Sequence, residues 1–262
     1  MNSICFWNSH KFWGGGEKLH LEYAEGFQNK NHHCFIVADP KSPLRDKAEA
    51  LQLKVHPFRI KKLDFLNPLK IYSIVRFFKQ TQTDTLIFSS SQDMKAAGMA
   101  AYIAGVSKIV YLRGLAVPIK NNFINRFFFN KVITHIIANS QETKRTILLH
   151  LKDKQIEQKI QIVYHGIENI PENDPDQNIL NTEFENSNKI ICGNAGRLTA
   201  QKGHRHLLEI AKILKARQLP FCIKIAGAGE LEQDLKKRIS EMQLEEQVML
   251  LGFVSDMQKI YA

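Results

Sequence analysis

Short apolar runs alternate with amphipathic segments from one end of the chain to the other. The runs of the first two thirds are apolar on both faces, which is typical of parallel strands covered by helices on either side. They read SICFWNS, HCFIVAD, DTLIFSS, KIVYLRG, THIIANS and KIQIVYHG. Because the segments between them have helical periodicity, this repetition of strand and helix predicts a doubly wound α/β sheet.

Two of the intervening segments show the period of an amphipathic helix clearly. The stripe expected to face the core in residues 16–28 consists of Leu19, Tyr23, Ala24 and Phe27. The corresponding stripe in residues 66–80 consists of Leu66, Leu69, Ile74 and Phe77. We therefore expect both segments to pack these side chains against the sheet.

The pattern breaks over residues 169–188, which are rich in Asn, Asp and Pro and show little periodicity. Such a stretch is typical of a linker and divides the chain into a first domain, 1–168, and a second, 189–262. Strand and helix alternation then resumes with the runs KIICGN, FCIKIAGAG and QVMLLGF. Three strands are too few for a complete doubly wound domain. The sequence thus predicts two Rossmann-like sheets facing a cleft, the second of them incomplete.

Composition narrows the class of protein. The chain has 262 residues and a formal net charge of +10, which favours an acidic partner. Its four cysteines are scattered singly in apolar runs, so we expect buried thiols in a reducing cytosol. The sequence shows no secretory signal and no apolar stretch long enough to cross a bilayer. His204 and His206 fall two apart on a predicted helix, on different faces, so no metal pair is expected.

The first glycine cluster is WGGGEK, directly after the first predicted strand. Gly15 and Gly16 there would let a phosphate or a sugar approach the start of a helix closely. The spacing differs from a dinucleotide-binding fingerprint. A flexible turn without a ligand is the alternative for this motif taken alone.

The second cluster, GRLTAQKG, lies where a strand of the second domain gives way to a helix. Arg197 and Lys202 are five residues apart and flank this turn. Backbone N–H groups and the helix dipole favour an anion at such a place, and Arg and Lys suit a phosphate. Solvated loop residues are the alternative, which the neighbouring glycines disfavour.

Two further strand ends of the second domain carry glycine. Gly227 and Gly229 follow the run FCIKIA, and Glu230 opens the next helix; a tight turn alone also explains this arrangement. Phe253 follows LLG at the next strand end, where it could stack on a base or pack beneath the sheet.

Taken in order, WGGGEK, IIANSQETKRTIL, IVYHGI, GRLTAQKG, IAGAGELEQDL and VMLLGFVSDMQKIY resemble the retaining GT-B glycosyltransferases of the glycogen-synthase-like group 1, or family 4, type. The resemblance implies transfer of a sugar from a nucleotide diphosphate sugar with retention of configuration and without a metal or other cofactor. It also implies that Arg197 and Lys202 hold the donor diphosphate. Gly15 and Gly16 would approach the donor, while Gly227, Phe253 and Val254 would line the nucleobase pocket.

The sequence departs from the family pattern in three places. Where the family offers a histidine near the sugar, this chain reads YLRGLAVP, and Arg113 is the candidate for a substitute catalytic role. The familiar Asn-Gly before the linker is His165-Gly166. The glutamate pair that contacts the donor in the family would lie beyond Ala262. On this ground we expect a truncated and catalytically inactive chain.

The resemblance places the protein in the assembly of cell-envelope polysaccharide or lipopolysaccharide, acting on a glycan or lipid-linked acceptor in the cytoplasm. Two alternatives stay open. One is a non-catalytic remnant that binds nucleotide or a partner, and the other is a GT-B sugar-nucleotide epimerase. No aromatic and basic motif supports a nucleic-acid partner.

Two segments of the first domain interleave basic and aromatic residues and predict contact with an anionic membrane surface. The first contains Arg59, Lys61, Lys62, Lys70, Arg76 and Lys79 among Phe58, Phe65 and Leu66. The second contains Lys120, Arg126 and Lys131 around Phe127 and Phe128. The alternative is a pair of core helices with solvated charged faces.

Overall fold

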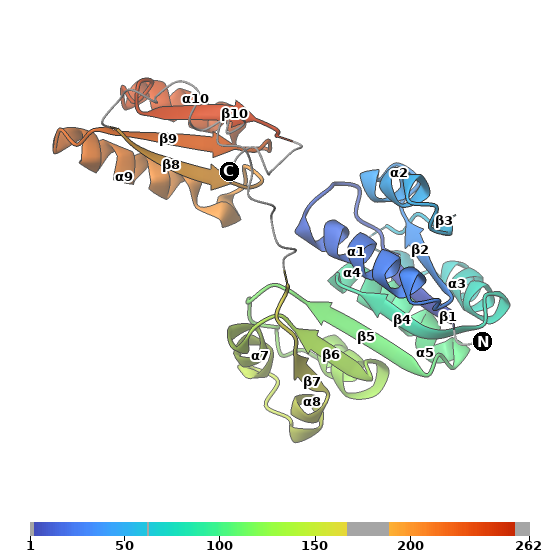
Figure 1. Cartoon of the computed structure of the whole chain (residues 1–262). Coiled ribbons are helices and arrows are strands. Elements are labelled where there is room, and N and C mark those ends of the chain that lie inside the picture. The colour runs from blue at the N-terminus through green and yellow to red at the C-terminus, as the bar shows by residue number, and fades with distance from the viewer. Residues whose placement is uncertain (1–2, 62, 167–188, 255–262) are drawn as a thin grey trace. The chain divides into compact units, whose positions relative to one another are not determined.

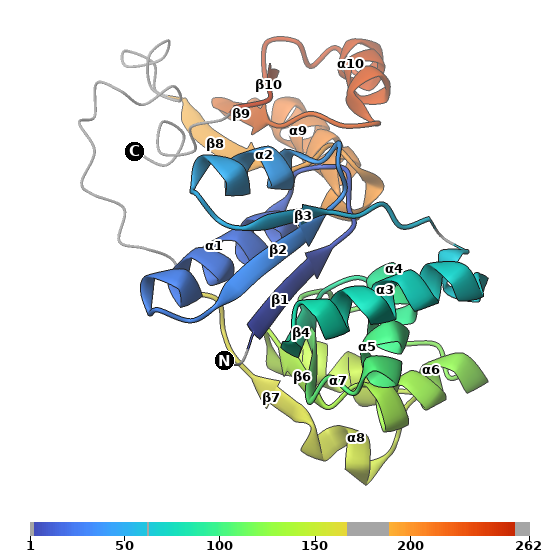
Figure 2. The same ribbon diagram turned by 90° about the vertical axis from the view of Figure 1, so that its right-hand side faces the viewer.

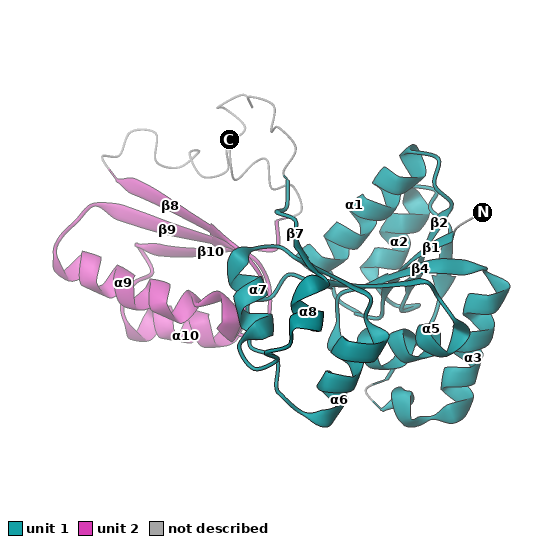
Figure 3. Ribbon diagram, turned by 90° about the horizontal axis from the view of Figure 1, so that it is seen from below, with its two compact units in different colours: residues 1–166 teal, residues 167–262 magenta. Residues whose placement is uncertain are grey.

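The protein consists of two compact units, Met1–Gly166 and Ile167–Ala262, in a computed structural model that describes residues 3–61, 63–166 and 189–254 (Figure 3). The predicted linker, residues 169–188, lies outside the described residues, as does the end of the chain from residue 255. Each unit is therefore described by itself below.

The first unit is built on a parallel sheet of seven strands (Figure 1). Its strands are β1 (Ser3–Asn8), β2 (Cys34–Ala38), β3 (Val55–Pro57), β4 (Thr83–Phe88), β5 (Lys108–Arg113), β6 (His135–Ala138) and β7 (Ile160–Ile162). They are ordered β3-β2-β1-β4-β5-β6-β7, so the chain runs outward from β1 first to one edge and then to the other. This order confirms the predicted doubly wound sheet, with β3 as an additional short edge strand.

Helices cover both faces of this sheet, as its doubly apolar strands require. Helices α1 (Gly15–Asn29) and α2 (Pro43–Ala50) lie on one face and the remaining helices on the other (Figure 2). The second layer comprises η1 (Asp64–Leu66), α3 (Pro68–Gln80), α4 (Ser91–Asp93), η2 (Met94–Gly98), α5 (Met99–Ala104), α6 (Phe123–Phe127), η3 (Phe128–Val132), α7 (Gln141–Leu148) and α8 (Lys154–Gln158).

Each face of the sheet has a core of its own. On β1, Phe6 points into the core beneath α1 and α2, whereas its neighbours Cys5 and Trp7 point into the larger core beneath α3 to α8. This alternation follows from the two-residue period of a strand. Trp7 is completely buried and packs its ring against Phe58 and Phe78.

The helix predicted over residues 66–80 is present, and its predicted buried face is confirmed in part, since Ile74 is buried and Phe77 packs against the core. Ile71, Ile74, Val75 and Phe78 face the core in α3. Leu66 and Leu69 were expected there and are instead 67% and 79% exposed. Asn67 caps the helix by accepting from the N–H groups of Leu69 and Lys70, with Pro68 at the first helical position. This cap fixes the start of the helix and leaves both leucines on the solvent side.

Helix α1 packs its predicted stripe against the core, since Ala24 is buried and Leu19, Tyr23 and Phe27 are partly buried against the same cluster. The other buried positions of this helix, Glu17, His20 and Leu21, were not predicted. Two polar side chains thus occupy the sheet-facing side of the first two turns. Buried polar groups need partners, which directs attention to this end of the helix.

The second unit contains a parallel sheet of three described strands in the order β10-β9-β8. Its elements are β8 (Ile190–Ala195), η5 (Ala200–Lys202), α9 (His204–Ala216), β9 (Phe221–Ala226), α10 (Glu232–Glu241) and β10 (Val248–Gly252). Helices α9 and α10 lie on the same face of the sheet, over a core that includes Leu208, Ile225 and Leu235 (Figure 3). Cys5, Cys34 and Cys222 are buried as predicted, but Cys192 is exposed because β8 is an edge strand.

Candidate functional site

The carboxyl ends of β1 and β4 form the point where the strand order of the first unit reverses. Strand β1 pairs with β2 on one side and with β4 on the other, and the connections that follow these strands leave toward opposite faces. Ligands of open α/β sheets bind at such a point. A group of polar residues gathers there, which we call the switch-point cluster: Asn8, Ser9, His10, Glu17, Ser90, Gln92 and Asp93.

Glu17 is the centre of one half of this cluster. Its carboxylate lies 2.8 Å from Nδ1 of His10 and accepts from the amide of Asn8 at 3.3 Å. Burial alone would raise the pKa of Glu17. The hydrogen bond and charge of His10, the backbone N–H of Glu17 and the side-chain amide of Asn8 outweigh this effect and lower the pKa. The Glu17 side chain is 5% exposed and that of His10 51% exposed, so a buried carboxylate orients a partly accessible imidazole.

Asp93 is the centre of the other half and is completely buried. Its Oδ2 atom accepts from the backbone N–H of Ser9 at 3.3 Å and from the hydroxyl of Ser90 at 2.7 Å. Its Oδ1 atom has no hydrogen-bond partner among the described residues. Burial raises the pKa of Asp93 and outweighs the hydrogen bonds that lower it. A carboxylate kept in such surroundings is typical of a functional site rather than of a core optimised for stability.

Replacing Asp93 with asparagine is expected to leave the first unit as stable as the wild type, or more stable, at neutral pH. Asparagine still accepts both hydrogen bonds now made to Oδ2 and removes the buried charge. Because the folded pKa of Asp93 is raised, the wild type loses stability as pH rises from the unfolded value through the folded one. Any advantage of Asp93→Asn should therefore shrink as pH is lowered toward about 4.

Urea unfolding followed by tryptophan fluorescence measures this difference at neutral and at acidic pH, since both tryptophans, Trp7 and Trp13, lie in the first unit. Asp84→Asn on β4, the strand that precedes α4, is the matched control, since Asp84 is only partly buried. A loss of more than about 1 kcal/mol in Asp93→Asn at neutral pH would show that the charge supports the fold.

The candidate residues of the first domain lie at this same edge of the sheet. Gly15 and Gly16 begin α1, directly after the loop that carries His10. Neither has a positive φ, and a Cβ added to either would meet nothing within 4 Å. The backbone conformation therefore does not by itself require glycine at either position. What the two glycines provide is open space beside the start of the helix.

Arg113 ends β5, the strand next to β4. Its guanidinium donates to the hydroxyl of Tyr111 at 3.1 Å and to the carbonyl of Val117 at 2.8 Å. Burial raises the pKa of Tyr111, and the charge and hydrogen bond of Arg113 oppose this. Two hydrogen bonds thus fix Arg113 at the end of the strand next to β4, and part of its hydrogen-bonding capacity is used within the protein.

In the second unit, Arg197 and Lys202 lie at the carboxyl end of β8. Arg197 follows the strand closely, and Lys202 ends η5, one residue before the αL glycine Gly203 that starts α9. Both side chains are exposed, and neither forms an ion pair with the described residues. The stem of Lys202 lies against Gly196, where an added Cβ would be 3.6 Å from Cδ. Two cations and the amino end of a 13-residue helix therefore border one turn.

The glycines that follow β9 have a structural role that the sequence did not reveal. Gly227 has a φ of +152°, and a Cβ there would lie 1.9 Å from the carbonyl oxygen of Gly196. A Cβ on Gly229 would lie 2.5 Å from the carbonyl oxygen of Leu198. Backbone hydrogen bonds join these turns, including Leu198 N–H to Ala228 at 3.1 Å. The absence of a side chain at both glycines thus lets the turn after β9 pack directly against the turn after β8, which carries Arg197.

The remaining residues that the sequence predicts to bind the nucleotide-sugar donor lie at the third strand end of this unit. Phe253 directly follows β10 and is 70% exposed, and Val254 next to it is partly buried. The backbone there joins the same network, since Gly227 N–H donates to Gly252 at 2.7 Å. Arg197, Gly227, Phe253 and Val254 thus follow adjacent strand ends of one sheet. Packing of Phe253 beneath the sheet, one of its two predicted roles, is wrong.

The switch-point cluster was not predicted from the sequence. The available signal was a polar pair, Glu17 and His20, at positions of α1 that helical spacing places on its buried side with Leu21 and Ala24.

Within the described ranges, no three His, Cys, Asp or Glu side chains come together as a metal site requires. No helix in that part of the chain is long and apolar enough to cross a membrane.

Comparison with known families matches both parts of the chain. Residues 13–169 match the family described as Glycosyltransferase Family 4, and residues 175–262 match the family described as Glycosyl transferases group 1. A glycosyltransferase of Methanocaldococcus jannaschii, MJ1059, is 27% identical over 213 residues, covering 75% of this chain and 50% of that protein. The chain thus spans about half the length of the curated relative it matches.

Solved structures show the same fold at low sequence identity. Anabaena Alr3699/HepE, in complex with UDP and glucose, superimposes with a TM-score of 0.78 at 19% identity, covering 99% of this chain and 71% of that chain. A glycosyltransferase from Rickettsia africae gives a TM-score of 0.77 at 17% identity, covering 99% and 70%. The lipopolysaccharide outer core galactosyltransferase WaaB, in its apo form, gives 0.67 at 18% identity, covering 97% and 69%.

Proposed function

The chain belongs to glycosyltransferase family 4 and has the α/β GT-B fold, and from this premise we propose that it serves the transfer of a sugar from a nucleotide diphosphate sugar to an acceptor. The observation that carries the proposal is the turn after β8, where Arg197, Lys202 and the start of α9 surround one place suited to a diphosphate. The UDP and glucose bound by the Anabaena neighbour support a nucleotide-sugar donor of this kind.

The positive charges at this turn define its proposed role in the reaction. As the bond between sugar and diphosphate lengthens, negative charge grows on the leaving phosphate oxygens. Arg197 offers a planar fork of donors and Lys202 a compact charge, and both stabilise that charge more strongly in the transition state than in the ground state. Among the described residues, neither side chain forms an ion pair with a carboxylate.

The other candidates complete the donor and acceptor sides of this proposal. Phe253 and Val254, beside Gly227, would line the nucleobase pocket, while Gly15 and Gly16 would leave room for the donor in the first unit. Arg113, at the end of β5, would act near the sugar. We further propose retention of configuration, no metal cofactor, and a glycan or lipid-linked acceptor of the cell envelope.

Calorimetric titration of the purified chain with UDP, GDP and ADP, each in parallel with its monophosphate, tests the proposed donor class. We expect one nucleoside diphosphate to bind at least about tenfold more tightly than its monophosphate, since charge-assisted contacts to the second phosphate contribute about 1.5–3 kcal/mol. Binding should persist in the presence of EDTA. Equal affinity for diphosphate and monophosphate across the series, or no binding of any nucleotide, would exclude the proposal.

A further inference from the structure

The helix layer that begins at η1 exposes large apolar side chains at several positions. They lie at η1, in the first half of α3 and in α6, and we call them with their basic neighbours the basic apolar face. Its apolar members are Leu63, Leu66, Leu69, Tyr72, Phe123 and Ile124. Leu69 is 79% exposed and Phe123 is 84% exposed, values that packing within the first unit does not require. Isolated exposed leucines are ordinary, but a group of this size marks an interaction surface.

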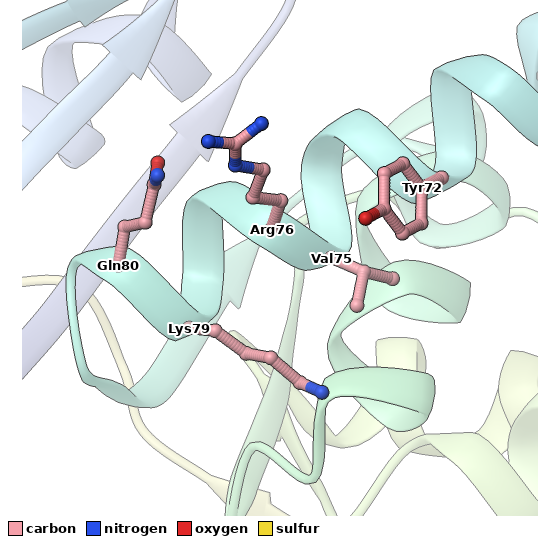
Figure 4. A pocket seen from close by; sticks show the side chains of 5 residues that line it. All are labelled: Tyr72, Val75, Arg76, Lys79 and Gln80. Carbon is pink, nitrogen blue, oxygen red and sulfur yellow. The ribbon is translucent and has the colours of Figure 1, made fainter.

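The exposed side of α3 changes from apolar to basic along its length. Leu69 and Tyr72 occupy its first turns, and Arg76 and Lys79 follow on the same side at helical spacing. Tyr72, Val75, Arg76, Lys79 and Gln80 line a surface hollow of about 330 Å³ (Figure 4). The guanidinium of Arg76 and the ammonium of Lys79 project away from the helix in this view.

Basic residues predominate in the middle of the first unit, from the end of η1 to the start of α7. Residues 65–141 contain nine Lys or Arg against two Asp, a net of +7 out of +10 for the whole chain. One of the two acids, Asp93, is completely buried, so the surface formed by these residues is almost free of negative charge. The basic residues are Lys70, Arg76, Lys79, Lys95, Lys108, Arg113, Lys120, Arg126 and Lys131.

The aromatic rings expected from the sequence to meet a membrane are not the ones that are exposed. Phe128 is buried, and Phe58, Phe65 and Phe127 pack against the core. Lys70 lies over the ring of Phe58 at 4.3 Å, and Lys95 lies over that of Phe65 at 5.4 Å. These side chains serve the fold, which leaves the exposed leucines, Tyr72 and Phe123 for an external partner.

We propose that the basic apolar face docks on an anionic lipid surface. Exposed aliphatic and aromatic side chains insert at the boundary between headgroups and acyl chains, while the surrounding cations attract anionic headgroups. Aliphatic side chains such as Leu66 and Leu69 give a nucleic acid nothing to stack on, which disfavours that class of partner. The inference rests on this face alone and does not depend on sugar transfer.

Vesicle flotation of the full chain tests the proposal. We expect recovery with phosphatidylcholine vesicles that contain phosphatidylglycerol, and little recovery with phosphatidylcholine alone. The double substitution Arg76→Gln and Lys79→Gln should lower partition of the protein onto anionic vesicles about tenfold or more at moderate salt. The reason is that each basic residue near the membrane surface adds to the electrostatic attraction by anionic headgroups. The double substitution Leu69→Ser and Phe123→Ser should lower the partition onto vesicles by a similar factor. This loss should persist at raised salt, because salt screens charges and does not weaken apolar insertion.

Matched controls come from the opposite half of the unit. Lys30→Gln with Lys54→Gln removes two exposed charges, and Phe12→Ser removes an exposed ring, so both should float like the wild type. Equal recovery with anionic and neutral vesicles, or equal losses in the control variants, would overturn the proposal. Binding of a duplex oligonucleotide that depends on Arg76 and Lys79, without vesicle binding, would overturn it in favour of a nucleic acid.

Discussion

Replacing Arg197 or Lys202 with alanine is expected to weaken binding of the cognate nucleoside diphosphate about ten- to a hundredfold. A charge-assisted hydrogen bond to a phosphate contributes about 1.5–3 kcal/mol, and each substitution removes one such group. Because both side chains would contact one diphosphate, the effects in the double variant should not simply add. Titration calorimetry on the single and double variants measures these changes.

Two controls separate charge from packing in this experiment. Lys202→Met keeps the aliphatic stem that lies against Gly196 and should lose affinity as Lys202→Ala does. Lys212→Ala removes an exposed cation of α9 away from the turn and should bind like the wild type. The unfolding free energy should scarcely change in any of these variants, since exposed cations contribute little to it. Wild-type affinity in both single alanine variants would refute the assignment.

Replacing Gly227 with alanine is expected to destabilise the second unit by about 3 kcal/mol or more. Its Cβ would lie 1.9 Å from the carbonyl oxygen of Gly196, and a φ of +152° is unfavourable for any residue with a side chain. The clash is with backbone, so relief requires the turn after β8 to move. The variant should therefore also lose diphosphate binding.

Gly196→Ala is the appropriate comparison for stability, because its Cβ would only make ordinary contact with the stem of Lys202 at 3.6 Å. Hydrogen exchange of the amides of β8 and β9 reports on this unit specifically. We expect protection to fall strongly in Gly227→Ala and little in Gly196→Ala. Equal protection in Gly227→Ala and the wild type would contradict the packing role of Gly227.

The sheet of the first unit was largely predictable because its strands are buried on both faces and read as unbroken apolar runs. The exception is β3, whose three residues, Val55–Pro57, are too few and too polar to stand out. The helices were found, and the side that each turns toward the sheet was predicted only in part. In α3, two adjacent stripes fit the helical period, and only the cap at Asn67 and packing against the sheet decide that Leu69 faces solvent.

The sites were harder to predict because their residues come together only in the folded sheet. Glu17 and Asp93 are far apart in sequence, and each lies near the end of a different strand, where β1 and β4 pair. The glycines after β9 suggest a ligand in the sequence, yet contact with the backbone of Gly196 and Leu198 requires them without any ligand. Sequence spacing cannot show which turns of a sheet lie side by side.

Amide NMR spectra of the chain during titration with its nucleoside diphosphate test the central claim most directly. We predict that the largest shifts on saturation fall on the amides of Gly196, Arg197 and Gly203, at the turn between β8 and α9. The same titration of the double alanine variant at Arg197 and Lys202 should leave these amides unshifted. Saturable binding with its largest shifts elsewhere in the chain, and undiminished in that variant, would contradict the account.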